Sequence, residues 1–170
     1  MIKNTSLKNK NVLITGGAGF IGSELTKQAL SLGANVSVVD NLVNGKKSNL
    51  NLDDKNLMFY EEDIRNQQVM QNLISKSDYV FNLACLGVRH SIHSPIESHS
   101  VNADATLNLL KMSRESKIKK FVHISTSEVY GTAKYVPMTD EHTTAPHTVY
   151  GASKFAGEAY ARAYSKSFNT

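Results

Sequence analysis

Cysteine is almost absent from this sequence, since Cys85 is the only one among 170 residues. A single cysteine excludes an internal disulfide. It ends the apolar run YVFNLAC, where we expect the thiol to be buried as a small hydrophobic group. Long apolar runs are absent too, and the N-terminal MIKNTSLKNK lacks the apolar centre of a signal peptide. We therefore expect a soluble cytoplasmic protein with no membrane partner.

Charge of one sign is not concentrated anywhere. The chain has 19 Lys and Arg against 15 Asp and Glu, a formal net charge of +4. Basic residues gather only in the short segments GKK (45–47) and KIKK (117–120), whereas a nucleic-acid-binding surface requires a denser basic stripe with interleaved aromatic residues. We expect no nucleic-acid partner, and a mild attraction for small molecules that carry phosphate.

Repeats, linkers and low-complexity segments are also missing, and hydrophobic residues make up 41% of the chain, so we expect one globular domain. Short apolar runs predict strands at 11–15, 35–40, 57–60, 78–85 and 120–125. Helical spacing predicts helices at 19–33, 66–75 and 101–112, and a last one from Tyr150. The strands are apolar nearly throughout, which indicates an α/β fold: a doubly wound parallel sheet with helices on both faces.

The glycine-rich turn TGGAGFIG follows the first predicted strand and opens the first predicted helix. Gly17, Gly19 and Gly22 satisfy the spacing of the dinucleotide-binding fingerprint. Gly16, Gly19 and Gly22 satisfy a variant in which every third residue is glycine. Missing side chains let backbone N–H groups approach a pyrophosphate, and the helix N-terminus favours its negative charge. Strand, turn and helix together indicate a Rossmann-like dinucleotide site.

Asp40 ends the second predicted strand, eighteen residues after Gly22. A carboxylate at this point can accept hydrogen bonds from the ribose hydroxyls of adenosine, and it repels a 2′-phosphate. The position therefore predicts NAD rather than NADP as the cofactor. The alternative is that Asp40 only starts a turn with Asn41, and the spacing from the glycine turn favours the ribose role.

The segment YGASKFAGEAYARAY places Tyr150 and Lys154 four residues apart, on one face of a predicted helix. A phenol titrates at about 10, but an adjacent ammonium stabilises the phenolate and lowers the pKa of the tyrosine. Hydroxyl groups follow the fifth predicted strand, at the end where open parallel sheets bind ligands. They belong to Ser125, Thr126 and Ser127. The alternative, an exposed Tyr and Lys on a surface helix, is weakened by the glycine turn and the carboxylate that precede them.

Together these motifs resemble the N-terminal part of an extended short-chain dehydrogenase/reductase, in the NAD-dependent epimerase/dehydratase group that acts on nucleotide sugars. TGGAGFIG, VVDNL, EEDIRN, FNLAC, STSEVYG and YGASKFAGE occur in the order and spacing of that family. The resemblance implies oxidation at C4 of the sugar, in which Tyr150 takes the hydroxyl proton as hydride passes to NAD. The resulting ketone would be re-reduced on its other face, dehydrated or decarboxylated.

The resemblance also implies roles for particular positions. The pyrophosphate would lie on Gly16, Gly19, Phe20, Ile21 and Gly22. The adenosine would contact Asp40, Asn41, Asp63 and Ile64. The nicotinamide end of the cofactor would contact Leu83, Ala84, Ser125, Tyr150 and Lys154, with Asn102 behind it. The catalytic set would be Thr126, Tyr150, Lys154 and Glu128.

Glu128 bears on which reaction follows the oxidation. An Asp-Glu pair follows the hydroxyl residue in the 4,6-dehydratases of the family, whereas Ser127-Glu128 stands here. Thr-Ser-Glu also resembles UDP-glucuronate decarboxylases, although ACLGVRHSIHSP is unlike their sequence after the fourth strand. Many epimerases carry a glutamate at this position, so a C4 epimerase leads, with a decarboxylase or 4,6-dehydratase as alternatives. Ser127 and Glu128 would contact the substrate, and a purely structural Glu128 is equally open.

The segment RHSIHSPIESH contains three histidines. A second cluster of Cys or His that could complete a zinc site is missing, so we expect no metal. We expect a polar loop at the mouth of the substrate site instead, with Arg89 near the sugar or phosphate of a UDP-sugar.

The family continues past the helix that carries Tyr150 and Lys154, into a sixth strand and a smaller domain that binds the nucleotide of the substrate. The chain stops at SKSFNT, where that strand would begin, so we expect residues 1–170 to be the NAD-binding domain without the C-terminal substrate domain. Remote substrate contacts help to position the reacting carbon, which keeps open a non-catalytic NAD-binding fragment that needs its missing half. The helices at 101–112 and 152–163 carry surplus apolar or small residues, and the family pairs them across a two-fold axis, which implies a homodimer.

Overall fold

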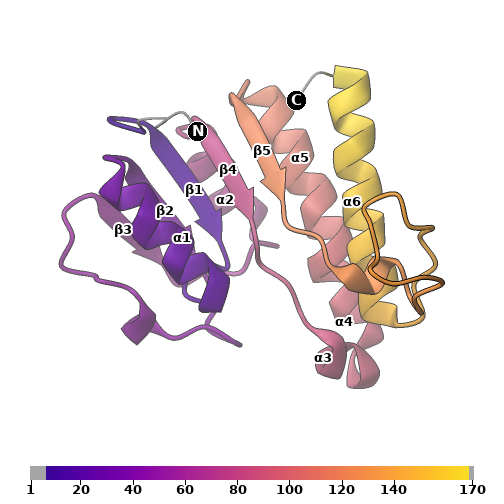
Figure 1. Ribbon diagram of the computed structural model, residues 1–170. Helices are drawn as coiled ribbons and strands as arrows, with labels where there is room; N and C mark the ends of the chain where they lie inside the picture. Colours follow the sequence, from indigo (N-terminus) through magenta and orange to yellow (C-terminus); the bar gives the residue numbers. More distant parts are fainter. Residues whose placement is uncertain (1–6, 169–170) are drawn as a thin grey trace.

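A five-stranded parallel sheet forms the centre of the molecule (Figure 1). The computed structural model describes residues 7–168. The strand order is β3-β2-β1-β4-β5, and every neighbouring pair is parallel. The strands are β1 (Asn11–Thr15), β2 (Asn35–Val39), β3 (Leu57–Tyr60), β4 (Tyr79–Asn82) and β5 (Lys120–His123). The chain order reverses at β1, so the sheet is doubly wound, which confirms the predicted fold class.

Helices cover both faces of this sheet (Figure 1). On one face α1 packs against β1 and β2, and on the other α2 packs against α5 while α6 runs beside α5. The helices are α1 (Phe20–Ser31), α2 (Gln67–Ile74), α3 (Val88–His93), α4 (Pro95–His99), α5 (Ala105–Glu115) and α6 (Val149–Phe168). A π-helical turn, Ser100–Asp104, joins α4 to α5, and 3₁₀ turns stand at η1 (Lys47–Asn49) and η3 (Ser127–Val129).

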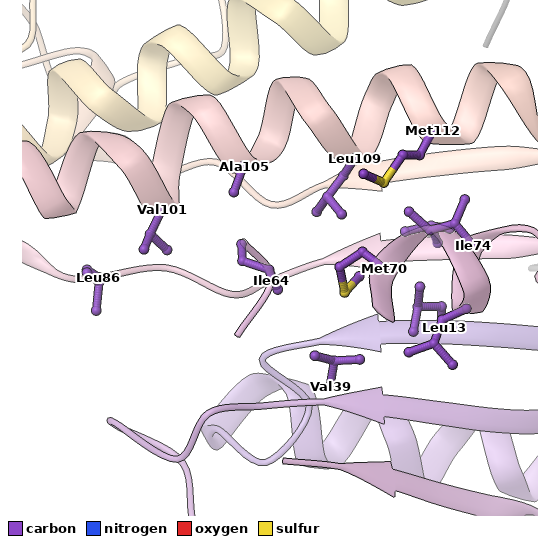
Figure 2. Close-up of a cluster of buried hydrophobic side chains, with 12 residues drawn as sticks. Leu13, Val39, Ile64, Met70, Ile74, Leu86, Val101, Ala105, Leu109 and Met112 are labelled. Carbon is purple, nitrogen blue, oxygen red and sulfur yellow. The ribbon is translucent and has the colours of Figure 1, made fainter. Parts of the chain in front are cut away.

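Alternate residues of the strands divide between two hydrophobic cores, because successive side chains point to opposite faces of a sheet. Val12 and Ile14 of β1 lie in the core beneath α1. Leu13, between them, lies in the other core with residues of α2 and α5. Figure 2 shows this second core, where Met70 of α2 and Leu109 of α5 lie among the apolar side chains of the sheet. Apolar burial on both sides therefore fixes the helices to the sheet.

The prediction of a polar loop at residues 89–99 is wrong, because residues 88–99 are helical. They form α3 and α4, and α4 begins at Pro95, a residue that suits the first turn of a helix. The buried positions of these helices are serines, Ser91 and Ser98, whereas Ile92 and Ile96 are 69% and 83% exposed. The apolar periodicity that reveals a helix is therefore missing from this segment.

Three strands are shorter at their carboxyl ends than predicted. β2, β4 and β5 end at Val39, Asn82 and His123, because the next residues leave the sheet to line a cavity. Most of the N-terminal stretch without signal-peptide character (1–6) and the last residues of the expected start of a sixth strand (169–170) lie outside the described residues. No helix within residues 7–168 combines the length and the apolar character needed to cross a membrane.

Candidate functional site

The turn after β1 can form only with glycine at certain positions. Gly16 has a φ of +69°, and its N–H donates to the Val39 carbonyl at 2.8 Å. A Cβ on Gly16 would lie 2.8 Å from the backbone nitrogen of Ala84, and one on Gly22 would overlap the Gly16 carbonyl oxygen. These glycines therefore allow the turn to pack directly against the chain that follows β4, and the first turn of α1 to pack against the glycine turn.

A cavity of about 610 Å³ lies along the carboxyl edge of the sheet, between the glycine turn and α6. Nearly all the residues to which the resemblance gives a cofactor role line it. They are Gly16, Gly19, Phe20, Ile21, Gly22, Asp40, Asn41, Asp63, Ile64, Leu83, Ala84, Ser125, Tyr150 and Lys154. Arg89, expected near the substrate, lines it as well. Segments far apart in the sequence meet here because all parallel strands end at the same edge.

Asp40 is buried in the cavity wall with 8% exposure. Its Oδ2 accepts a hydrogen bond from the Ala18 N–H at 3.0 Å, and its Oδ1 accepts one from the Leu42 N–H at 2.8 Å. Gly45 packs so closely that a Cβ there would lie 2.8 Å from Oδ1. A carboxylate oxygen has two lone pairs, so Asp40 can still accept hydrogen bonds from a pair of neighbouring hydroxyls.

Asp63 is held in place by Arg65. The guanidinium donates from Nε to Oδ1 at 2.9 Å and from Nη2 to Oδ2 at 2.8 Å, and the Asn41 amide adds a bond at 3.1 Å. The Arg65 side chain holds the pKa of Asp63 below its ordinary value. Arg65 also lies 3.4 Å from Glu97 of α4, which pairs with His90 of α3 at 2.9 Å. Polar contacts thus connect the loop after β3 with both short helices.

Tyr150 and Lys154 reach the cavity from the first turns of α6. The Lys154 ammonium donates to the Ile124 carbonyl at 2.6 Å, and the residue is 2% exposed. Burial lowers the pKa of Lys154, while the neighbouring Cys85 and Glu158 act in the opposite direction. The ammonium keeps two further N–H groups that can donate to a ligand.

The pKa of Tyr150 is raised, so the expectation that Lys154 lowers it is wrong for this structure. Burial is the largest cause, and the neighbouring Cys85 and Glu128 side chains add to the increase. A hydrogen bond with the Thr126 side chain acts in the opposite direction. Lys154 does not offset burial, because its ammonium is itself dehydrated and donates to a backbone carbonyl.

The polar residues after β5 do not share one environment. Thr126 caps η3 by accepting from the Glu128 N–H at 3.3 Å, and its side chain lies near enough to Tyr150 to favour the phenolate. Ser127 is exposed and lies outside the cavity lining, so its predicted substrate contact has no support in this geometry. Glu128 also lies outside the lining and accepts from the Thr148 hydroxyl at 3.2 Å. Its closeness to Tyr150 keeps it in the candidate catalytic set.

Asn102 lies behind the cavity and is 1% exposed. Its amide oxygen accepts from the Leu86 N–H, and its amide nitrogen donates to the Leu86 carbonyl, both at 2.9 Å. The same nitrogen donates to the Ser153 hydroxyl at 3.0 Å. Asn102 therefore lies behind the expected cofactor site, where its contacts fix the chain after β4 against α6.

Several cavity residues escaped the sequence analysis. Cys85, expected in the core, is only partly buried and lines the cavity near Tyr150, because β4 ends three residues before it. The others are Val39, Val43, Asn44, Gly45, Glu62, Leu86, Gly87, Val88, His90, Val101 and Ile124. Most of them follow the carboxyl ends of β2, β3, β4 and β5, a position that could have identified them from the sequence.

The histidines of α3 and α4 do not gather into a metal site. His90 pairs with Glu97 at 2.9 Å, and His99 lies 3.5 Å from Asp104. Across residues 7–168, no group of three or more His, Cys, Asp or Glu side chains is placed to hold a metal ion. Each of these two histidines instead has a carboxylate of its own.

The parallel sheet, its glycine turn and the Tyr150 helix are the arrangement of the extended short-chain dehydrogenases/reductases. Within that class the chain belongs to the family described as GDP-mannose 4,6 dehydratase, which matches residues 13–170.

Curated relatives and solved structures agree with this membership. The putative UDP-glucose 4-epimerase of Methanocaldococcus jannaschii is 34% identical over 158 residues, which are 91% of this chain and 51% of that protein. The UDP-N-acetylglucosamine 4-epimerase of Methanobrevibacter ruminantium M1, in complex with UDP-N-acetylmuramic acid, has a TM-score of 0.89 at 34% identity and covers 95% of this chain and 52% of its own. The dTDP-glucose 4,6-dehydratase of Streptomyces venezuelae, with NAD and TYD bound, has a TM-score of 0.87 at 32% identity, covering 94% and 52%. The chain spans about half the length of the curated relatives it matches.

Proposed function

We propose that residues 1–170 are the NAD-binding domain of a nucleotide-sugar epimerase/dehydratase. One observation carries this proposal: a single cavity joins a glycine turn and the buried carboxylate of Asp40 to the Tyr150 and Lys154 side chains of α6. A dinucleotide needs these contacts for its pyrophosphate, its adenosine ribose and its reactive ring. The solved dTDP-glucose 4,6-dehydratase, which has NAD bound, supports the same choice of cofactor.

The residues present fit NAD. Cβ atoms on Gly16 or Gly22 would clash with neighbouring backbone. Their absence lets a pyrophosphate approach the backbone N–H groups of the turn. Asp40 retains lone pairs for the two ribose hydroxyls and opposes the additional charge of a 2′-phosphate. Asp63 and Ile64 would flank the adenine, and the two remaining N–H groups of Lys154 would serve the nicotinamide ribose.

Proton transfer in the proposed reaction belongs to Tyr150. Bound NAD supplies a hydride acceptor for the hydrogen on C4 of the sugar. The proton of the C4 hydroxyl would pass to the Tyr150 oxygen, which the nearby Thr126 side chain would help to orient. Lys154 would hold the nicotinamide ribose next to Tyr150 through its two remaining N–H groups.

A C4 epimerase acting on a UDP-sugar is the reaction that we propose first. The Methanocaldococcus and Methanobrevibacter relatives are both 4-epimerases whose names include a UDP-sugar. In addition, Ser127 stands where the resemblance to the dehydratases would require an aspartate. The 4,6-dehydratase alternative keeps support from the Streptomyces structure, and a nucleotide-sugar decarboxylase remains a further alternative. Products would separate the three: an epimer, a dehydrated ketone, or released CO₂.

A non-catalytic NAD-binding module is the second candidate, because the residues that line the cavity would serve NAD binding even without turnover. Substrate contacts beyond this chain would then be needed to position the reacting carbon. Thermal shift with NAD and then with a UDP-sugar distinguishes the two. A module that only binds NAD gains stability from NAD alone, whereas a complete site gains more with the sugar nucleotide.

We further propose a homodimer built mainly on α6. Ala152, Ala159 and Ala163 are exposed along this helix, where small side chains allow a second helix to approach closely. On α5, Leu109 and Met112 are buried in the core of the chain itself, whereas Leu107 is only half-buried. The alanines of α6 and Leu107 of α5 would therefore provide the apolar part of the contact.

Calorimetric titration with NAD and NADP tests the proposed cofactor. NAD should bind and NADP should bind at least about tenfold more weakly, because the 2′-phosphate would face a buried carboxylate. Asp40→Ala should narrow this preference, while Asp53→Ala, at an exposed position, should leave it unchanged. Equal or tighter binding of NADP by the unaltered chain would contradict the proposal.

A further inference from the structure

Helix α6 carries four polar side chains at intervals of four residues: Tyr150, Lys154, Glu158 and Arg162. Side chains with this spacing lie along one side of a helix. The proposed reaction uses the first two and leaves the other two without a role. Glu158 is the unusual one, because its side chain is only 16% exposed, and a largely buried carboxylate requires compensating partners.

Both carboxylate oxygens of Glu158 have short contacts. Oε2 accepts from the Ser125 hydroxyl at 2.6 Å, and Oε1 pairs with Arg162 at 2.6 Å. Ser125 lines the cavity, and it donates its hydroxyl proton to Glu158. The Ser125 oxygen can therefore present only lone pairs to a ligand, which makes it an acceptor for a ligand N–H or O–H.

Glu158 also acts on Lys154, which lies one helical turn before it. Within residues 7–168, the titratable groups that act on Lys154 are Cys85 from the chain after β4, His123 from β5 and Glu158 from its own helix. Glu158 is the only carboxylate among them. Burial lowers the pKa of Lys154, and Cys85 and then Glu158 counteract that effect, so removing the carboxylate would leave a dehydrated ammonium with less compensation.

We propose that Glu158 is a positioning residue of the cofactor site, which holds the Ser125 hydroxyl in its acceptor orientation and places a negative charge one helical turn from the Lys154 ammonium. One side chain thereby fixes two groups on the cavity wall from behind. This inference rests on the proposed function, because Ser125 and Lys154 matter in this way only if the cavity holds NAD.

Titration of the Lys154 side chain tests the electrostatic part without any ligand. Its ε-methylene signal can be followed by ¹³C NMR between pH 6 and 11, and the signal is assigned by its loss in Lys154→Met. Glu158→Gln removes the charge but keeps the shape, so the Lys154 midpoint should fall by about half a pH unit or more. Glu115→Gln, an exposed glutamate paired with Lys111, is the matched control and should leave the midpoint unchanged.

Arg162→Gln provides a second measurement if Glu158→Gln fails to fold. Its guanidinium is 66% exposed, so the fold should tolerate the change. Removal of this cation leaves the Glu158 charge less compensated, and the Lys154 midpoint should rise. A midpoint that stays at the wild-type value in every folded variant would overturn the inference, because a merely structural Glu158 affects stability and not the ionisation of Lys154.

NAD titrations separate this inference from the proposed function. Glu158→Gln should bind NAD about tenfold more weakly at pH 8, a loss comparable to one charge-assisted hydrogen bond. As the pH is raised, the NAD affinity of this variant should begin to fall at a lower pH than that of the wild type. Affinity that matches the wild type at every pH, despite a shifted Lys154 midpoint, would overturn the role at the cofactor. No NAD binding by the wild type would contradict the proposed function, while the NMR titration would still decide whether Glu158 sets the charge of Lys154.

Discussion

At the scale of single residues, Tyr150 and Lys154 are both less easily ionised than in water, because the cavity wall shields them from solvent. Burial raises the pKa of Tyr150 and lowers that of Lys154, so it favours the uncharged form of both side chains. A positively charged nicotinamide ring beside Tyr150 would favour the phenolate. We therefore expect Tyr150 to ionise more easily in the presence of NAD than in its absence.

Substitutions of these two residues should have different effects on NAD binding. Tyr150→Phe removes the proton acceptor and keeps the ring, so folding and NAD affinity should stay close to wild type. Lys154→Met removes an ammonium whose N–H groups are expected on the nicotinamide ribose, so affinity should fall about tenfold. Calorimetry on both variants, with circular dichroism as the folding control, measures the difference. If both variants bind NAD like the wild type, α6 is a structural helix here.

His123 gives the chain a pH dependence of stability. Burial, with the charge of Lys154 adding to it, lowers the pKa of His123 to about 3, while an unfolded histidine has a pKa of about 6.5. The unfolded chain therefore binds the proton first, and stability is lost as the pH falls below about 6.5. At pH 5 the loss should be about 2 kcal/mol relative to pH 7.5.

Urea unfolding at both pH values checks this expectation. His123→Asn should lose much less stability on acidification, while His147→Asn, at an exposed position, should behave like the wild type. The carboxylates with lowered pKa, such as Asp63 and Asp78, lose their contribution only nearer pH 4. A wild type whose stability is the same at pH 5 and pH 7.5 would show that His123 is not buried in its neutral form.

At the scale of elements, α6 is expected to connect two copies of the chain. Its exposed alanines (Ala152, Ala159 and Ala163) leave room for close helix packing. The chain should therefore sediment as a dimer at tens of micromolar, where stable interfaces persist. Ala159→Arg should shift it to monomer, and Lys27→Glu on α1, which covers the other face of the sheet, should not. A monomer at that concentration in the unaltered chain would contradict the proposed interface.

Elements with apolar periodicity were predictable, and those without it were not. The five strands and the helices that bury Met70 or Leu109 have a continuous apolar signal. The short helices α3 and α4 bury serines and expose isoleucines, so their sequence resembles a loop. The π-helical turn was equally invisible, because the apolar spacing of Val101 and Ala105 fits an ordinary helix.

At the scale of the whole molecule, the topology makes the site. Five parallel strands end at one edge, and that edge gathers the glycine turn, Asp40, Asp63, Ser125 and the start of α6. These residues could be predicted because each follows a strand or opens a helix. The raised pKa of Tyr150 and the direction of the Ser125 hydroxyl could not, because both depend on partners that only the folded structure brings near.

A crystal structure of the chain grown with NAD tests the central claim most directly. We expect the adenosine ribose on Asp40, the pyrophosphate on the glycine turn and the nicotinamide within contact of Tyr150 and Lys154. The Ser125 hydroxyl should still point to Glu158. NAD bound elsewhere, or in this cavity with its nicotinamide away from Tyr150, would contradict the account.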